Sequence, residues 1–333
     1  MNFCIFGAGA WGTAMSIHLH RLGHTVTLVP RRLAHAAAIA TTRENAEHLP
    51  GAPLHPDIQV AHEPAPPLME ADVVLLACPS RGLRALAGKI SRSLDAAWRV
   101  RVFISLAKGL EEGTLLRPSQ IIEEVLPGRR HGVLSGPSNA GEVVRGLPTA
   151  LVFAGGGDPA LSQPVQAALS GGALRIYHSP DVAGVELGGV LKNVYAIGAG
   201  ICDGLELGEN AKAAYLTRAV QEMLRVGGAA GGQTETFLGL SGVGDLIATA
   251  HGGWSRNRAF GEAVARGENI QRYLAASSAV VEGYRATANF LALARRCGIS
   301  APILEELNSV LFRAKDPRAG VAALLNRLLK SEN

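Results

Sequence analysis

The chain has 333 residues, which at roughly 150 residues per domain predicts about two domains. Apolar residues make up 47% and charged residues 18%, below the usual charged share of about 25%, so the composition excludes a disordered chain. The formal net charge is only +4, and no run of Lys and Arg exceeds two residues. This argues against nucleic-acid binding through a basic tract.

Cysteines and histidines give no sign of cross-links or metal ligands. The four cysteines are far apart without a CxxC pair, as is typical of a reducing compartment. The ten histidines include no HExxH-type pair, so we expect no metal site. No apolar run approaches about 18 residues, and no signal peptide opens the chain. We therefore expect a cytoplasmic protein without membrane insertion.

The first part of the chain alternates short apolar runs with helical stretches. Strands are predicted at 2–6, 25–29, 58–60, 73–77, 101–106, 132–135, 149–154 and 173–178, and helices at 12–22, 33–47, 80–93, 117–126, 139–146 and 159–169. Runs that are apolar at every residue suit strands buried on both faces of a parallel sheet. The alternation predicts a Rossmann-type, doubly wound α/β domain that binds a dinucleotide, over residues 1–181.

No convincing strand follows residue 181. Helices are predicted at 183–201, 208–227, 233–238, 242–250, 256–266, 271–276, 283–298, 302–313 and 319–330, separated by glycine-rich joints. The sequence therefore predicts that residues 182–333 form an all-α domain.

A glycine-rich turn follows the first predicted strand and precedes the first helix. Gly7, Gly9 and Gly12 form a G-x-G-x-x-G pattern, which in this position is typical of dinucleotide binding. Gly7 permits the tight turn, Gly9 lets the backbone approach a pyrophosphate, and Gly12 lets helix and strand pack closely. A merely tight turn between strand and helix is the alternative.

The second strand ends in two arginines where an NAD-preferring site would carry an acid. Arg31 and Arg32 offer guanidinium groups that could hold the 2′-phosphate of NADP(H). NADP(H) is therefore favoured, with NAD(H) tolerated. Solvated loop arginines are the alternative.

Lysine is rare, with six residues against 26 arginines, so lysines inside motifs are informative. Lys108 follows the fifth strand, at the sheet edge where ligands bind, and Ser138 follows the next strand. Lys192 shares a helix face with Gly184, Gly188 and Gly200. Those glycines predict either close helix packing or open space for a ligand beside a lysine whose pKa burial would lower.

Further polar groups stand at predicted helix starts. Asp245 and Thr249 are four residues apart and share a face. Ser255 is placed as the N-cap of a helix that begins with Arg256 and Asn257, a combination that suits an anion, although a capped helix with exposed arginines explains it as well. Glu282 lies beside a glycine at another helix start.

Together these motifs resemble bacterial NAD(P)-dependent glycerol-3-phosphate dehydrogenase over nearly the whole chain. The segments that carry the resemblance are GAGAWGTA at 7–14, SLAKGLE at 105–111, SGPSNA at 135–140, LKNVYAIGAGICDGL at 191–205, LSGVGDLIATA at 240–250, SRNRAFG at 255–261 and VVEGY at 280–284. The resemblance implies hydride transfer between NAD(P)H and dihydroxyacetone phosphate, supplying glycerol 3-phosphate for phospholipid synthesis, in a protein that is commonly a homodimer.

The resemblance also implies roles for individual residues. Lys192 would be the catalytic proton acceptor, oriented by Asp245, with Lys108 also in the catalytic set. The implied substrate ligands are Lys108, Gly136, Ser138, Lys192, Asp245, Ser255, Arg256 and Asn257. The implied cofactor ligands are Gly7, Gly9, Ala10, Trp11, Gly12, Arg31, Arg32, Lys108, Ala140, Arg256, Val280 and Glu282.

Three positions depart from the family pattern. Ala10 replaces the usual Ser near the pyrophosphate, Asn139 replaces the usual Phe, and Gly141 stands where a charged residue is common. Two other functions fit parts of this pattern. A related β-hydroxy acid dehydrogenase would need carboxylate recognition and a different lysine helix, and a non-catalytic NADP(H) sensor would need no proton donor.

Overall fold

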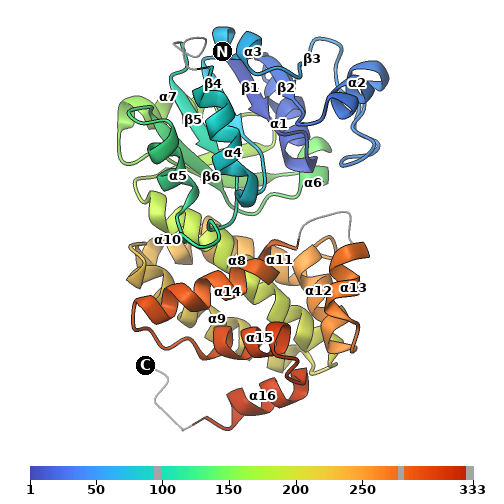
Figure 1. Ribbon diagram of the computed structural model, residues 1–333, viewed down its shortest axis with the longest axis vertical. Helices are drawn as coiled ribbons and strands as arrows, with labels where there is room; N and C mark the ends of the chain where they lie inside the picture. The colour runs from blue at the N-terminus through green and yellow to red at the C-terminus, as the bar shows by residue number, and fades with distance from the viewer. Residues whose placement is uncertain (94–98, 277–280, 328–333) are drawn as a thin grey trace. The chain divides into compact units, whose positions relative to one another are not determined.

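The computed structural model describes residues 1–93, 99–276 and 281–327 (Figure 1). The chain divides into two compact units, Met1–Glu186 and Leu187–Asn333, each described here by itself. None of the described helices is long and apolar enough to cross a membrane.

Unit 1 is built on one eight-stranded sheet with the order β3-β2-β1-β4-β5-β6-β7-β8. Its strands are β1 (Asn2–Phe6), β2 (Thr25–Val29), β3 (Gln59–Val60), β4 (Val73–Leu76), β5 (Val102–Ser105), β6 (His131–Ser135), β7 (Thr149–Ala154) and β8 (Leu174–Ser179). β1 pairs with β2 on one side and with β4 on the other. The order of the strands in the sheet therefore reverses direction at β1. Ligands bind beyond the carboxyl ends of the strands at such a reversal.

Helices cover both faces of this sheet, as the alternating pattern predicts. They are α1 (Ala10–Arg21), α2 (Leu33–Thr42), α3 (Ala65–Glu70), α4 (Ser80–Ser91), α5 (Pro118–Val125), α6 (Ala140–Val144) and α7 (Pro159–Leu169). Phe3 and Ile5 of β1 pack in one core with residues of α1 and α7, whereas Cys4 and Phe6 pack in a second core with α3, α4 and α5. Successive side chains of a strand point to opposite faces, so one apolar strand supplies both cores. The doubly wound α/β fold is confirmed.

Three local features differ from the sequence-based expectation. β7 runs antiparallel to β6, while the other neighbouring strands of the sheet are parallel. Helix α3 was not predicted; its two prolines, Pro66 and Pro67, lie in the first turn, where no backbone N–H is needed. Helix α2 ends at Thr42 rather than at residue 47, because Arg43 adopts a left-handed conformation with φ 53°.

Among the residues that the structure describes, all regular secondary structure after β8 is helical, and helices make up unit 2. Its helices are α8 (Val182–Gly204), which begins in unit 1, α9 (Glu209–Ala229), α10 (Thr234–Leu238), the π-helix η2 (Leu240–Gly244), α11 (Asp245–His251), α12 (Arg256–Ala265), α13 (Ile270–Ala276), α14 (Glu282–Arg296), α15 (Pro302–Phe312) and α16 (Pro317–Leu325). Every residue from 187 to 202 of α8 is buried. The helix predicted at 319–330 extends beyond the described residues.

Candidate active site

The glycine-rich turn joins β1 to α1 at the reversal of the strand order. A Cβ on Gly7 would lie 2.3 Å from the Ala77 carbonyl oxygen, and one on Gly12 would lie 2.0 Å from the Gly7 oxygen. These two glycines are therefore required by the packing of the protein itself. A Cβ on Gly9 would meet nothing within 4 Å, so no contact inside unit 1 requires glycine there.

The N-terminus of α1 suits a phosphate. Gly9 is its N-cap and supplies no side-chain cap, and no acid stands in the first turn, where Ala10, Trp11 and Gly12 lie. The exposed N–H groups and the helix dipole favour a negative charge at this point. Open space over Gly9 and an uncapped helix end fit the pyrophosphate of a dinucleotide.

Arg31 and Arg32 are exposed directly after β2. The turn is tied to this strand end, because the Gly7 amide donates a hydrogen bond to the Val29 carbonyl oxygen over 2.9 Å. Arg32 forms an ion pair with Glu47, and each side chain remains about half exposed, at 52% and 50%. The sequence analysis did not identify Glu47 as a neighbour of this strand end, because it lies 15 residues after Arg32 in the chain.

Lys108 and Ser138 meet at one backbone carbonyl. The Lys108 Nζ donates to the Gly136 oxygen over 3.0 Å, and the Ser138 hydroxyl donates to the same oxygen over 2.9 Å. The two side chains are brought together because β5 and β6 are parallel neighbours whose carboxyl ends share an edge. The structure thus brings together two side chains that the sequence places at the ends of successive strands.

The departures at 139 and 141 have a local explanation. Asn139 is the N-cap of α6, and its side-chain oxygen accepts a hydrogen bond from the Glu142 amide over 3.0 Å. A Cβ on Gly141 would lie 3.3 Å from that same Asn139 oxygen, so glycine at 141 leaves room for the cap. Ala140 is the first residue of the short helix that results.

Lys192 lies in a buried polar cluster within unit 2. Its Nζ donates to the Asp245 Oδ1 over 2.8 Å and to the Thr249 Oγ1 over 2.8 Å. The side chains of Lys192 and Asp245 are only 7% and 1% exposed. A charge-assisted hydrogen bond in such surroundings fixes the position of the ammonium group. The sequence pattern places Thr249 on the same helix face as Asp245 but does not identify it as a site residue; the structure adds it to the cluster.

The glycines on the lysine face of α8 support close packing rather than open space. A Cβ on Gly188 would lie 3.0 Å from the Ser241 carbonyl oxygen, and one on Gly200 would lie 2.0 Å from the Arg258 oxygen. The expectation of a cleared floor for a ligand is therefore wrong at these two positions. The glycines instead let η2 and α12 approach the helix that carries Lys192.

A second hydrogen-bonded network joins α8, α12 and α14. The Asn257 Nδ2 donates to the Asn193 Oδ1 over 2.9 Å, and the Asn257 Oδ1 accepts from the Gly283 amide over 3.0 Å. The Asn193 Nδ2 donates to Glu282 over 3.3 Å. Asn257 is thus buried and engaged within unit 2, while its neighbour Arg256 is exposed at the first position of α12.

Ser255 is the N-cap of α12, as predicted, and its hydroxyl oxygen accepts from the Arg258 amide over 3.2 Å. Glu282 opens α14. Val280 lies outside the described residues.

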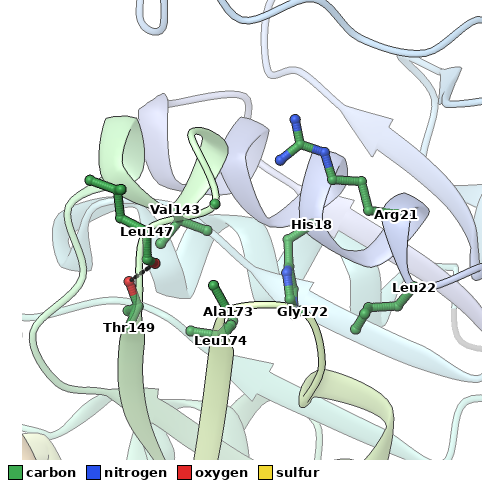
Figure 2. A pocket seen from close by; sticks show the side chains of 10 residues that line it. His18, Arg21, Leu22, Val143, Leu147, Thr149, Gly172, Ala173 and Leu174 are labelled. Carbon is green, nitrogen blue, oxygen red and sulfur yellow. Dashed lines mark hydrogen bonds between the residues drawn. The ribbon is translucent and has the colours of Figure 1, made fainter.

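A cavity of about 190 Å³ in unit 1 lies apart from the predicted site residues, none of which lines it (Figure 2). His18 lines the cavity, and its Nε2 donates to the Leu169 oxygen over 2.9 Å. Burial lowers the pKa of His18.

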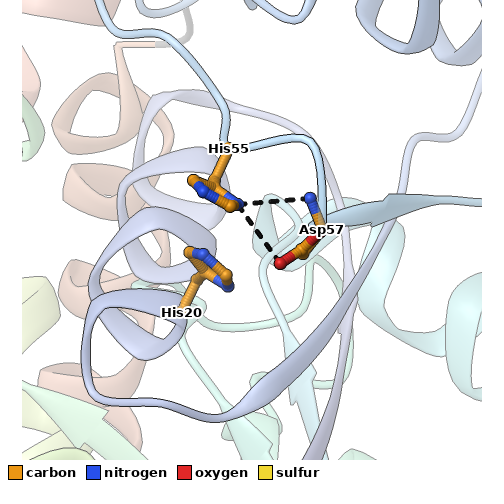
Figure 3. Close-up of side chains that lie close together, drawn as sticks. All are labelled: His20, His55 and Asp57. Atoms are coloured by element: carbon orange, nitrogen blue, oxygen red, sulfur yellow. Dashed lines mark hydrogen bonds and ion pairs between the residues drawn. The ribbon is translucent and has the colours of Figure 1, made fainter.

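The histidines that we expected to bind no metal belong to two groups whose side-chain atoms lie close enough to hold an ion. In the first, His20 stacks on His55, and the His55 Nδ1 lies 3.6 Å from the Asp57 Oδ2 (Figure 3). The second consists of His35, Glu47 and His48.

The chain matches both halves of one family. Residues 2–158 match the N-terminal family model of NAD-dependent glycerol-3-phosphate dehydrogenase, and residues 181–322 match its C-terminal model. The chain is 43% identical over 333 residues to glycerol-3-phosphate dehydrogenase [NAD(P)+] of Thiobacillus denitrificans, covering all of both chains. It is 43% identical over 335 residues to the enzyme of the same name from Thermus thermophilus, again over the full length of both.

A solved structure gives the same result. The crystal structure of glycerol-3-phosphate dehydrogenase from Coxiella burnetii is 34% identical to this chain, covers 98% of each chain and superposes with a TM-score of 0.92. The chain therefore belongs to the NAD-dependent glycerol-3-phosphate dehydrogenase family.

Proposed function

We propose that this chain is an NAD(P)-dependent sn-glycerol-3-phosphate dehydrogenase that interconverts dihydroxyacetone phosphate and glycerol 3-phosphate, for use in glycerophospholipid synthesis. The observation that carries the proposal is the buried Lys192–Asp245 pair, with Nζ and Oδ1 2.8 Å apart. A lysine fixed by a carboxylate is suited to proton transfer at a carbonyl oxygen. The family to which the chain belongs requires that step.

Lys192 moves the proton of the reaction. In reduction its ammonium group polarises the ketone of the substrate and gives a proton to the oxygen that becomes the alcohol. In oxidation the neutral amine takes that proton from the alcohol. The hydride at C2 of the three-carbon phosphate would be supplied or accepted by the nicotinamide of NAD(P)(H) when that cofactor is bound. Asp245 and Thr249 hold the Nζ atom in one position, so little reorganisation accompanies the transfer.

Two groups of residues are proposed as substrate ligands. Lys108, Gly136 and Ser138 form the cluster at the strand ends of unit 1. In unit 2, Ser255 is the N-cap of α12, and Arg256 and Asn257 are its first two residues. The N-terminus of a helix favours an anion, and here we assign it to the substrate phosphate. Binding energy from the phosphate then positions the reacting carbon.

The cofactor is NADP(H) by preference, with NAD(H) accepted. Gly7, Gly9, Ala10, Trp11 and Gly12 present the helix N-terminus to the pyrophosphate. Arg31 and Arg32 would hold the 2′-phosphate, and the other residues proposed to contact the cofactor are Lys108, Ala140, Arg256, Val280 and Glu282. The finer expectations are a homodimer, a cytoplasmic location consistent with four free cysteines, and a functional boundary between residues 181 and 182.

The decisive experiment measures NADPH oxidation with dihydroxyacetone phosphate for wild type and Lys192→Ala. We expect activity in the wild type and a loss of about 10²–10⁴-fold in kcat for the variant. Inactive wild-type enzyme would reject the substrate assignment, and full activity of the variant would reject the role of Lys192.

The chain offers a matched control for the loss of a buried lysine. Lys212 is also 7% exposed in its side chain and donates to Asp203 over 2.8 Å within the same unit. Lys212→Ala removes a buried ion pair of the same length but no proposed site residue. It should lose stability, as Lys192→Ala does, while the folded enzyme keeps its kcat.

A further inference from the structure

Glu47 forms an ion pair with Arg32, one of the two arginines that the proposed function assigns to the 2′-phosphate. The Arg32 Nη2 donates to both carboxylate oxygens of Glu47, at 2.6 Å from Oε1 and at shorter range from Oε2. Arg31 has no ion-pair partner among the described residues, so Arg32 is the member of the arginine pair that already carries an acid. Any anion that binds Arg32 must share it with Glu47.

The carboxylate is held beside the cofactor turn. Two residues before Glu47, the buried Asn45 Nδ2 donates to the Ala8 carbonyl oxygen over 2.8 Å and to the Thr13 Oγ1 over 2.8 Å. Ala8 belongs to the glycine-rich turn, and Thr13 lies in the first turns of α1. The loop that carries Glu47 is thus anchored to the segment that would hold the pyrophosphate.

The carboxyl group of Glu47 is charged at neutral pH. The Arg32 guanidinium lowers the pKa of Glu47, with smaller contributions from His48 and His35. The His48 Nε2 lies 3.4 Å from the Glu47 Oε1. A negative charge therefore lies beside the arginine that would hold the ribose 2′ group of the cofactor.

This charge has opposite consequences for the two cofactors. A 2′-phosphate carries negative charge, so it is repelled by Glu47 and competes with it for Arg32. A 2′-hydroxyl has a proton to donate, and an acid that accepts it is the usual mark of an NAD site. We propose that Glu47 is a specificity-determining residue that weakens NADP(H) binding by competing for Arg32 and so brings NADP(H) and NAD(H) affinities closer together.

The inference rests on the proposed cofactor site, and nucleotide binding to the full-length enzyme tests it without catalysis. Calorimetric titration with NADP⁺ and with NAD⁺ gives the two dissociation constants for wild type, Glu47→Gln, Arg32→Ala and the double variant. Glu47→Gln should tighten NADP⁺ binding about 3- to 10-fold, the range for release of an exposed ion pair and removal of a nearby like charge. NAD⁺ binding should stay equal or weaken, and the NADP⁺ gain should shrink at high salt.

Two controls separate the possible failures. Glu63→Gln removes another exposed carboxylate of unit 1, 71% exposed, and should leave both dissociation constants unchanged. In the Arg32→Ala background Glu47→Gln should lose the larger part of its effect, because the shared guanidinium is gone.

The outcomes are distinct. An unchanged ratio of the two dissociation constants in Glu47→Gln, while Arg32→Ala weakens NADP⁺ binding, overturns the role of Glu47 and leaves the proposed cofactor site standing. If Arg32→Ala also leaves NADP⁺ binding unchanged, both the inference and the 2′-phosphate role of Arg32 are wrong.

Discussion

Replacement of Lys192 by methionine separates what the buried ion pair does for stability from what it does for catalysis. Lys192→Met keeps the length of the side chain but leaves the Asp245 carboxylate, 1% exposed, without its ammonium partner. Removing one member of a buried pair costs about 3–5 kcal/mol, because the remaining charge stays desolvated. In a unit of this size the thermal midpoint should fall by about 6–20 °C.

The double variant Lys192→Met/Asp245→Asn removes both charges. A buried pair replaced by uncharged groups of similar volume is often close to neutral in stability, so most of the loss should be recovered. Catalysis should not be recovered, because the double variant lacks Lys192, the group proposed to exchange a proton with the substrate oxygen. The expected kcat remains about 10²–10⁴-fold below wild type.

The assay is thermal unfolding followed by circular dichroism, alongside the rate of NADPH oxidation with dihydroxyacetone phosphate. If Lys192→Met were as stable as wild type, the buried Asp245 carboxylate would not need the Lys192 ammonium group to offset its charge. Restored activity in the double variant would refute proton transfer by Lys192. Both results together would leave the buried pair without either role.

Three further predictions concern unit 1 and the buried groups. Gly9→Ala should keep wild-type stability and weaken nucleotide binding in a calorimetric titration, whereas Gly12→Ala should lower the thermal midpoint, because its Cβ would lie 2.0 Å from the Gly7 oxygen. Burial lowers the pKa of His18 from 6.5, so the folded state resists its protonation; the free energy of unfolding in urea should fall as pH drops below about 6.5, and His18→Gln should lack that decline. Burial raises the pKa of Cys202 to about 11, so iodoacetamide labelling measured by mass spectrometry should be slow at neutral pH and rise about tenfold per pH unit; fast labelling at neutral pH would contradict this environment.

Local sequence chemistry determined the elements and the motifs. The glycine turn between β1 and α1, the Ser255 cap of α12 and the strand ends at Lys108 and Ser138 all depend on neighbours in the chain or on a repeated pattern. Turn glycines, capping hydroxyls and apolar runs act over a few residues, so their consequences can be predicted without the fold.

The direction of β7 was decided by tertiary geometry. A parallel crossover must carry the chain back along the strand, and β6 with five residues is about 17 Å long. Helix α6 has five residues, spans about 7.5 Å and is followed by an antiparallel strand. Helix α7 has 11 residues, spans about 16 Å and connects parallel strands, β7 and β8. The sequence predicted a helix in both connections but not the direction of the strand that follows.

Partners distant in the chain were likewise beyond sequence patterns. Residue spacing alone placed Lys192 and Asp245 on separate helices, and only the family resemblance implied that Asp245 orients Lys192; the structure joins them across 53 residues in a buried contact. It also joined Arg32 to Glu47, and it showed that Gly188 serves helix packing rather than a ligand. Residue type and local spacing identify groups capable of chemistry, whereas their charge balance and the space around them depend on which helices and strands pack together, because desolvation and close contact are properties of the folded chain.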